Sequence, residues 1–193
     1  MNTLKAEKRD MNTKAKKLRR EGYVTGTVFG RELPETIPLK LDKREVERLL
    51  KTEGKGGRVL LEVEGQTYNA LIKEVDYNPL KRQVDEIDFQ ALVSGEKVHS
   101  TAEIHLVGAD LCAGVPEQML QEISYRALPD SLVDRIQVDV GTLKVGDTIK
   151  VKDLDIAKDS NVDMMTDPEK VVVTITEIHS APAEEEAEGD TAQ

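Results

Sequence analysis

Short runs in which apolar and polar residues alternate recur along most of the chain, and they constrain the fold more than any other feature. In the first 92 residues these runs occupy 23–30, 37–41, 58–64, 66–75 and 83–92. Alternation with a period of two turns one side of a strand inward and the other outward. Tight turns are predicted at Glu64-Gly65 and at Asn78-Pro79. The pattern predicts an antiparallel β domain.

One segment of this first part breaks the alternation. Asp42 can cap a helix in which Val46, Leu49 and Leu50 recur at helical spacing, and Gly54 is expected to end it. Residues 1–20 are too polar for a core element, so we expect a basic arm or loop there.

After residues 93–96 the alternating runs return without a helix. They occupy 98–107, 121–127, 135–140, 148–151 and 170–178. The chain is therefore predicted to be mainly β with few helices, with one domain over residues 1–92 and a second β-rich domain over residues 93–182. Residues 183–193 lack any large apolar side chain and are expected to form an acidic, disordered tail.

Charge is distributed unevenly. The chain carries a formal net charge of -10, yet residues 1–92 hold 19 basic and 16 acidic residues, and residues 93–193 hold 8 and 21. An acidic surface repels nucleic acid, whereas clustered lysine and arginine attract phosphate, although such clusters are also common on plain solvated surfaces. The cluster lies in the first twenty residues, at Lys5, Lys8, Arg9, Lys14, Lys16, Lys17, Arg19 and Arg20.

The setting predicted for the chain is the cytoplasm. Cys112 has no partner for a disulfide within the chain. The first residues do not have the apolar core of a signal peptide, and no run approaches the ~18 apolar residues that a membrane span requires.

The sequence contains no clear pattern of catalytic, metal-binding or phosphate-binding residues. His99, His105 and His179 are far apart without metal-ligand spacing, so we read them as surface or edge-strand residues rather than ligands. The glycines of 54–57 follow the predicted helix instead of opening one, which favours a helix stop over a phosphate-binding loop. Cys112 has no local general base and is interpreted as a structural or incidental thiol. We expect no catalysis, cofactor or metal.

The run 83–92 contains three carboxylates, Asp85, Glu86 and Asp88. Their spacing alone does not define a catalytic set. Alternation places Glu86 and Asp88 on one side of the strand, opposite Ile87 and Phe89, so this pair is predicted to face solvent or a ligand.

Several short motifs resemble a known family. They are Leu4-Lys-Ala-Glu-Lys-Arg9, Lys17-Leu-Arg-Arg-Glu-Gly-Tyr-Val24, Gly26-Thr-Val-Phe-Gly30, Asn78-Pro-Leu-Lys81 and Ile87-Asp-Phe-Gln90, followed by Ile136-Gln-Val-Asp-Val140 and Asp167-Pro-Glu-Lys-Val-Val-Val-Thr174. In order and spacing they are similar to the bacterial ribosomal proteins that bind 5S rRNA and include the general stress protein Ctc. The second half resembles the long, two-domain branch, and the similarity covers about residues 3–180.

The resemblance implies a barrel-like first domain that binds the loop E region of 5S rRNA in the central protuberance of the large ribosomal subunit. The second domain would then face other large-subunit components or solvent. The positions that match RNA-contacting residues of the family are Arg9, Arg19, Arg20 and Asp88, and Lys14, Lys16 and Lys17 would add phosphate contacts.

Three residues depart from the family pattern. Glu86 stands where the family usually has histidine, Phe29 where it has tyrosine, and Thr25 where it has proline. Two of these changes remove a hydrogen-bonding group from the implied RNA face, and Glu86 adds a negative charge, so RNA binding is expected to be weaker than in a typical member. Phe29 can equally be a core residue.

Two functions from different classes therefore remain open. The first is a structural, rRNA-binding component of the ribosome that is monomeric off the ribosome and has no membrane partner. The second is a stress-related protein-interaction module whose acidic second domain binds basic partners and whose RNA binding is reduced.

Overall fold

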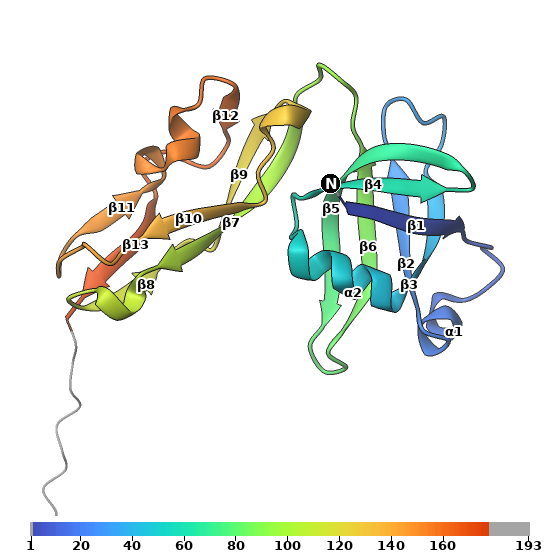
Figure 1. Cartoon of the computed structure of the whole chain (residues 1–193), viewed down its shortest axis with the longest axis horizontal. Helices are drawn as coiled ribbons and strands as arrows, with labels where there is room; N and C mark the ends of the chain where they lie inside the picture. The colour runs from blue at the N-terminus through green and yellow to red at the C-terminus, as the bar shows by residue number, and fades with distance from the viewer. Residues whose placement is uncertain (1, 178–193) are drawn as a thin grey trace, which may run out of the picture.

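A computed structural model of the chain describes residues 2–177 and shows two β-rich domains side by side (Figure 1). The predicted acidic tail and His179 lie outside the described residues. The first domain comprises β1 (Asn2–Lys8), α1 (Ala15–Arg20), β2 (Tyr23–Phe29), β3 (Ile37–Asp42), α2 (Lys43–Thr52), β4 (Arg58–Val63), β5 (Gln66–Asn78) and β6 (Gln83–Ala91). Its strands form a closed barrel in the order β1-β3-β2-β6-β5-β4.

The barrel confirms the predicted mainly β, barrel-like fold, but its strand pairing is not purely antiparallel. Two pairs, β1 with β4 and β2 with β6, run parallel. The other four neighbouring pairs are antiparallel. The antiparallel prediction was wrong for these two pairs because alternation marks the faces of a strand and says nothing about the direction of its neighbour.

The first twenty residues are also more ordered than expected. They contain β1 and α1 in place of a basic arm. Leu4 and Ala6 point into the barrel, and Leu18 is the one buried residue of α1. These three apolar residues anchor the segment, while most of their polar neighbours are exposed.

The helix α2 begins at the cap that the sequence predicts and ends at Thr52, two residues before the predicted stop at Gly54. The carboxylate of Asp42 accepts hydrogen bonds from the main-chain N–H groups of Arg44 and Glu45, at 2.8 and 3.2 Å. This satisfies two of the donors that a helix N-terminus leaves free. Val46 and Leu49 bury the apolar side of the helix against the barrel core.

The second domain contains two smaller sheets. Its strands are β7 (Val98–Val107), β8 (Val115–Gln118), β9 (Glu122–Ala127), β10 (Arg135–Asp139), β11 (Thr148–Lys150), β12 (Val162–Met164) and β13 (Val171–Thr176). They pair in the orders β10-β7-β9-β12 and β11-β13-β8. The sequence did not predict β8 and β12, which are edge strands of three or four residues and too short for a visible alternation.

The two domains are closely joined. Leu71 of β5 is fully buried in the hydrophobic core of the second domain. Gly56 has a positive φ of 87°, and a Cβ on it would overlap the carbonyl oxygen of Thr101 on β7. Arg58 donates a hydrogen bond of 2.8 Å to the carbonyl oxygen of Pro129. The glycines of 54–57 therefore follow the end of the helix, and Gly56 allows the second domain to approach the barrel.

Candidate nucleic-acid interface

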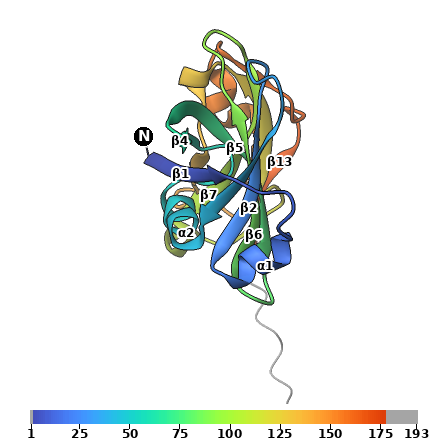
Figure 2. The same ribbon diagram turned by 90° about the vertical axis from the view of Figure 1, so that its right-hand side faces the viewer.

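The short helix α1 gathers most of the basic residues singled out in the sequence. Lys14 is its N-cap residue, and the helix itself carries Lys16, Lys17, Arg19 and Arg20. The helix lies at one end of the first domain, with Leu18 buried beneath it (Figure 2). All except Arg19 are largely exposed.

Three of these residues line a recess of about 510 Å³ beside the hairpin that joins β5 and β6. Its walls are Lys16, Arg19, Arg20, Lys81 and Gln83. Four cationic side chains and one amide, without an acidic group in the lining, form a surface suited to a phosphate group, because arginine and lysine donate charge-assisted hydrogen bonds to phosphate oxygens. Lys81 and Gln83 were not selected from the sequence, although Lys81 closes one of the family-like motifs.

Arg19 connects this recess to the outer face of β6. Its Nε donates a hydrogen bond of 3.1 Å to the main-chain oxygen of Asp85. The same guanidinium lies 3.9 Å from a carboxylate oxygen of Asp85 and 3.9 Å from one of Glu86. Arg19 is thus oriented by the strand, and part of its charge is neutralised before any ligand arrives.

Asp85 belongs to the fold rather than to the exposed face. The side chains of Asn78 and Gln83 donate hydrogen bonds to its carboxylate at 3.0 and 2.7 Å. These hydrogen bonds hold the pKa of Asp85 below its usual range, and Arg19 contributes in the same direction. The buried side chain of Thr25 also donates to the Asp85 main-chain oxygen, so Thr25 is not part of an RNA-facing surface.

Glu86 and Asp88 lie on the outer side of β6, while Ile87 and Phe89 are fully buried. This agrees with the alternation predicted from the sequence. Asp88 accepts hydrogen bonds from the main-chain N–H and the hydroxyl of Thr27, at 2.9 and 2.7 Å. Its carboxylate therefore ties β6 to β2 and has a fixed orientation.

Phe29 and Arg9 occupy different surroundings. Phe29 is half-buried at the end of β2, opposite Gln90 of β6, and does not belong to the barrel core cluster. Arg9 follows β1 and donates a hydrogen bond of 3.1 Å to the main-chain oxygen of Thr13. Its Nε is buried without a hydrogen-bond partner among the described residues. Arg9 thus braces the loop that leads to α1.

Two further carboxylates flank the outer face of β6, and sequence reasoning missed them. In the register of β5 and β6, Glu74 lies opposite Asp88, and Asp76 lies opposite Glu86. The register shifts between Ile72 and Glu74 and again between Asp76 and Tyr77. These irregularities interrupt the alternation of β5, so the sequence gives no sign that its acids adjoin those of β6.

Within residues 2–177 no group of three or more histidine, cysteine, aspartate or glutamate side chains is arranged to hold a metal ion. His99 and His105 lie exposed on β7, and Cys112 is a half-buried free thiol. No described helix is long and apolar enough to cross a membrane.

Comparison with known proteins identifies the two halves of the chain separately. Residues 4–89 match the Ribosomal L25p family, and residues 97–179 match the C-terminal domain of ribosomal protein TL5. The alignments with these relatives cover nearly the full length of this chain and of the relative. The protein of Caldanaerobacter subterraneus named large ribosomal subunit protein bL25 is 33% identical over 192 residues, which is 97% of this chain and 96% of that one. This chain belongs to the ribosomal L25p family.

Other relatives carry the same name. The Bacillus velezensis protein is 32% identical over 97% of this chain and 94% of its own length. The Staphylococcus epidermidis protein is 31% identical over 90% of this chain and 79% of its own. The family inferred from the short motifs is confirmed, and so is its two-domain branch.

Proposed function

We propose that this member of the ribosomal L25p family is a non-catalytic, RNA-binding constituent of the large ribosomal subunit in the cytoplasm. Relatives that align with this chain over nearly their whole length are named large ribosomal subunit proteins. The observation that carries the proposal is the recess between α1 and the β5–β6 hairpin, lined by Lys16, Arg19, Arg20 and Lys81. This recess is basic in a chain whose net charge is -10.

The RNA that fits this site best is the loop E region of 5S rRNA, as the resemblance implies. The recess would hold backbone phosphates, and the outer side of β2 and β6 would lie against base edges. Asp88 suits that second role because its oriented carboxylate can accept hydrogen bonds from base amino groups. The second domain would then contact other large-subunit components, and off the ribosome the protein would be a monomer.

Binding should be weaker than in a member that carries histidine in place of Glu86. Glu86 partly neutralises Arg19, and the neighbouring Asp76 adds a second negative charge to the same face. A contact of this kind contributes on the order of 1 to 3 kcal/mol to nucleic-acid recognition, so the affinity for RNA would fall by about one to two orders of magnitude.

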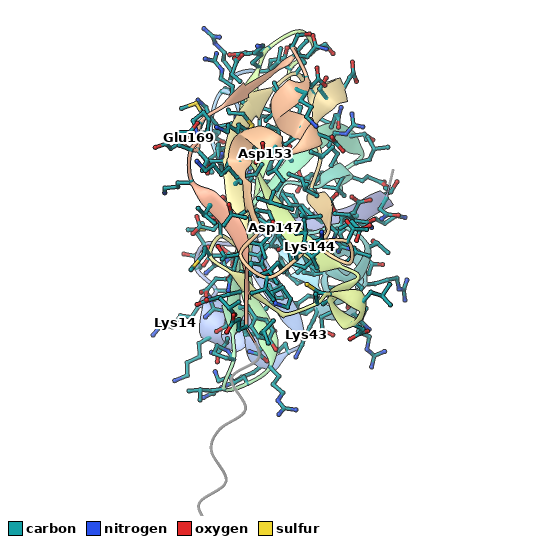
Figure 3. All side chains as sticks on the ribbon, turned by 90° about the vertical axis from the view of Figure 1, so that its left-hand side faces the viewer. Lys14, Lys43, Lys144, Asp147, Asp153 and Glu169 are labelled. Carbon is teal, nitrogen blue, oxygen red and sulfur yellow. The ribbon has the colours of Figure 1, made fainter. Side chains whose placement is uncertain are left out.

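Titration of the protein with 5S rRNA, with the isolated loop E fragment and with an unrelated RNA helix tests the proposal. We expect tighter, salt-sensitive binding to the first two. Arg20→Ala should weaken binding and reduce the salt slope by roughly 1. The matched control is Lys144→Ala, which removes an exposed lysine of the second domain (Figure 3). Equal affinity for the unrelated helix, or equal effects of the two variants, would rule out this site.

A protein-interaction module is the second candidate, and one observation favours it. Glu74, Asp76, Glu86 and Asp88 lie on adjacent strands of one face, which would repel RNA and attract a basic protein. The same titration separates the two functions, because this candidate requires that 5S rRNA and the unrelated helix bind equally weakly.

A further inference from the structure

A second basic hollow lies on the other side of the β5–β6 hairpin, between α2 and the second domain. It has a volume of about 570 Å³. We call it the interdomain groove. Leu50 and Lys51 of α2, Tyr77 and Arg82 of the hairpin, and Arg135 of β10 are among its lining residues. The groove is therefore formed by residues of both domains.

The charge of the groove is positive. Its lining contains four basic side chains, from Lys51, Lys55, Arg82 and Arg135, and two acidic ones, from Glu47 and Glu103. Lys55 is paired with Glu122 at 3.3 Å, Arg135 with Asp134 at 3.7 Å, and Glu47 with Lys43 at 3.8 Å. Among the ion pairs of residues 2–177, neither Lys51 nor Arg82 has an acidic partner, and both are exposed. These two charges are available to an anionic ligand.

Tyr77 gives the groove a feature that a phosphate site alone would not need. Its side chain is 54% exposed, although large apolar and aromatic groups on β5 otherwise pack inward. Arg82, at the far end of the same hairpin, also lines the groove. An exposed aromatic ring in a groove that also holds cationic side chains can stack on an unpaired base, because every base presents a π face.

Arg135 is fixed relative to the barrel by a short chain of contacts. The main-chain N–H of Gly54 donates a hydrogen bond of 3.2 Å to the carboxylate of Asp134. The same carboxylate oxygen lies 3.7 Å from Nε of Arg135. The second domain thus places a preoriented arginine at the edge of the groove.

The groove adjoins the recess described above. Gln83 lines both hollows, so the hairpin forms a narrow ridge between them. Lys81 faces the recess and Arg82 faces the groove, which gives the ridge a cation on each side. A nucleic-acid backbone bound at the recess would therefore remain close to a cationic side chain as it crosses this ridge.

We propose that the interdomain groove is a second RNA contact, which takes an unpaired nucleotide adjoining the segment bound at α1. Lys51, Arg82 and Arg135 would contact phosphates, and Tyr77 would stack on the base. This inference rests on the proposed RNA-binding function and adds a role for the second domain in it. The arrangement favours RNA because a nucleotide supplies both a phosphate for the cationic side chains and a base for the exposed ring, and because the groove adjoins the basic recess.

Tryptophan fluorescence provides the test, because the chain contains no tryptophan. Tyr77→Trp places a single reporter in the groove. The matched control is Leu111→Trp, at a position that is 80% exposed in the second domain and outside the groove. We expect full-length 5S rRNA to quench the Tyr77→Trp emission strongly, the minimal loop E duplex to quench it little, and neither RNA to affect Leu111→Trp.

Affinity measurements complete the test. Arg135→Ala should weaken binding of full-length 5S rRNA by roughly three- to tenfold and lower its salt slope by about 1, with no change for the minimal duplex. Arg20→Ala should weaken binding of both RNAs. If Arg20→Ala behaves in this way while Tyr77→Trp is not quenched, the groove proposal is overturned and the α1 site stands. Equal quenching by a polyglutamate peptide would overturn the assignment to RNA, and failure of every RNA to bind would overturn both proposals.

Discussion

Removal of the Glu86 charge is the most informative perturbation of the proposed RNA site. The Glu86 carboxylate lies 3.9 Å from the guanidinium of Arg19, the one basic residue of α1 that is anchored on β6. Glu86→Gln keeps the size of the side chain and removes its charge. Arg19 would then keep its hydrogen bond to the main chain of Asp85 and present more of its charge to a phosphate.

The size of the effect follows from the geometry. Two unit charges at 3.9 Å interact by about 1 kcal/mol in water and by about 4 kcal/mol at an effective dielectric constant of roughly 20. The side chains of Arg19 and Glu86 are 27% and 44% exposed, which places the pair near the lower value. A gain of about 1 kcal/mol corresponds to about fivefold tighter RNA binding. One additional effective cation should steepen the salt slope by roughly 0.7 to 0.9.

The assay is a titration with 5S rRNA at two salt concentrations. Glu117→Gln is the matched control, because it removes the same charge from an exposed position on β8 of the second domain. Glu86→His, which installs the residue usual in the family, should strengthen binding at least as much as Glu86→Gln. Affinity and salt slope that stay unchanged in both Glu86 variants, or that change equally in Glu117→Gln, would refute the idea that Glu86 limits RNA binding.

Three further predictions concern the fold that supports the site. Gly56→Ala should lower the free energy of unfolding by about 2 to 4 kcal/mol in urea titrations, because its φ of 87° disfavours a side chain and a Cβ would overlap Thr101. Gly65 has a similar φ but lies in open space, so Gly65→Ala should lower the free energy of unfolding by only about 1 kcal/mol. Asp42→Ala should cost about 1 kcal/mol through loss of the cap of α2, and an unchanged urea midpoint would contradict that role. The pKa of Asp85 is lowered in the folded state, so its contribution to stability is present at pH values above its unfolded pKa of 3.8 and is lost as the pH falls through its folded pKa. In a plot of melting temperature against pH, Asp85→Asn should therefore reduce the fall of the melting temperature at acid pH.

Prediction from the sequence succeeded where the governing interactions are local. The strand bounds of β7 match the alternating run 98–107, and α2 begins at the cap that Asp42 provides. The side-chain direction of Glu86 was also predicted correctly, because it depends only on its position relative to Ile87 and Phe89. The basic residues of α1 were found as candidates, although their segment was wrongly expected to be a loop.

The remaining features depend on contacts between residues far apart in the chain. Leu71 lies on a barrel strand yet completes the core of the second domain, and no local pattern distinguishes it from its neighbours. Lys81 joins the recess only because the hairpin folds beside α1. Glu74 and Asp76 reach the face of β6 only through the irregular register of β5.

The sequence by itself therefore determined most of the longer strands, the helix α2, the inward and outward sides of β6 and the family, since a period of two, a helix cap and a motif are properties of a few consecutive residues. The tertiary structure alone decided which charges meet. Closure of the barrel placed Arg19 against Glu86, and the close approach of Gly56 to Thr101 brought Arg135 and Tyr77 into the lining of one groove. Electrostatic and stacking interactions act over a few ångströms in space, and that distance is set by strand pairing and domain packing rather than by separation along the chain.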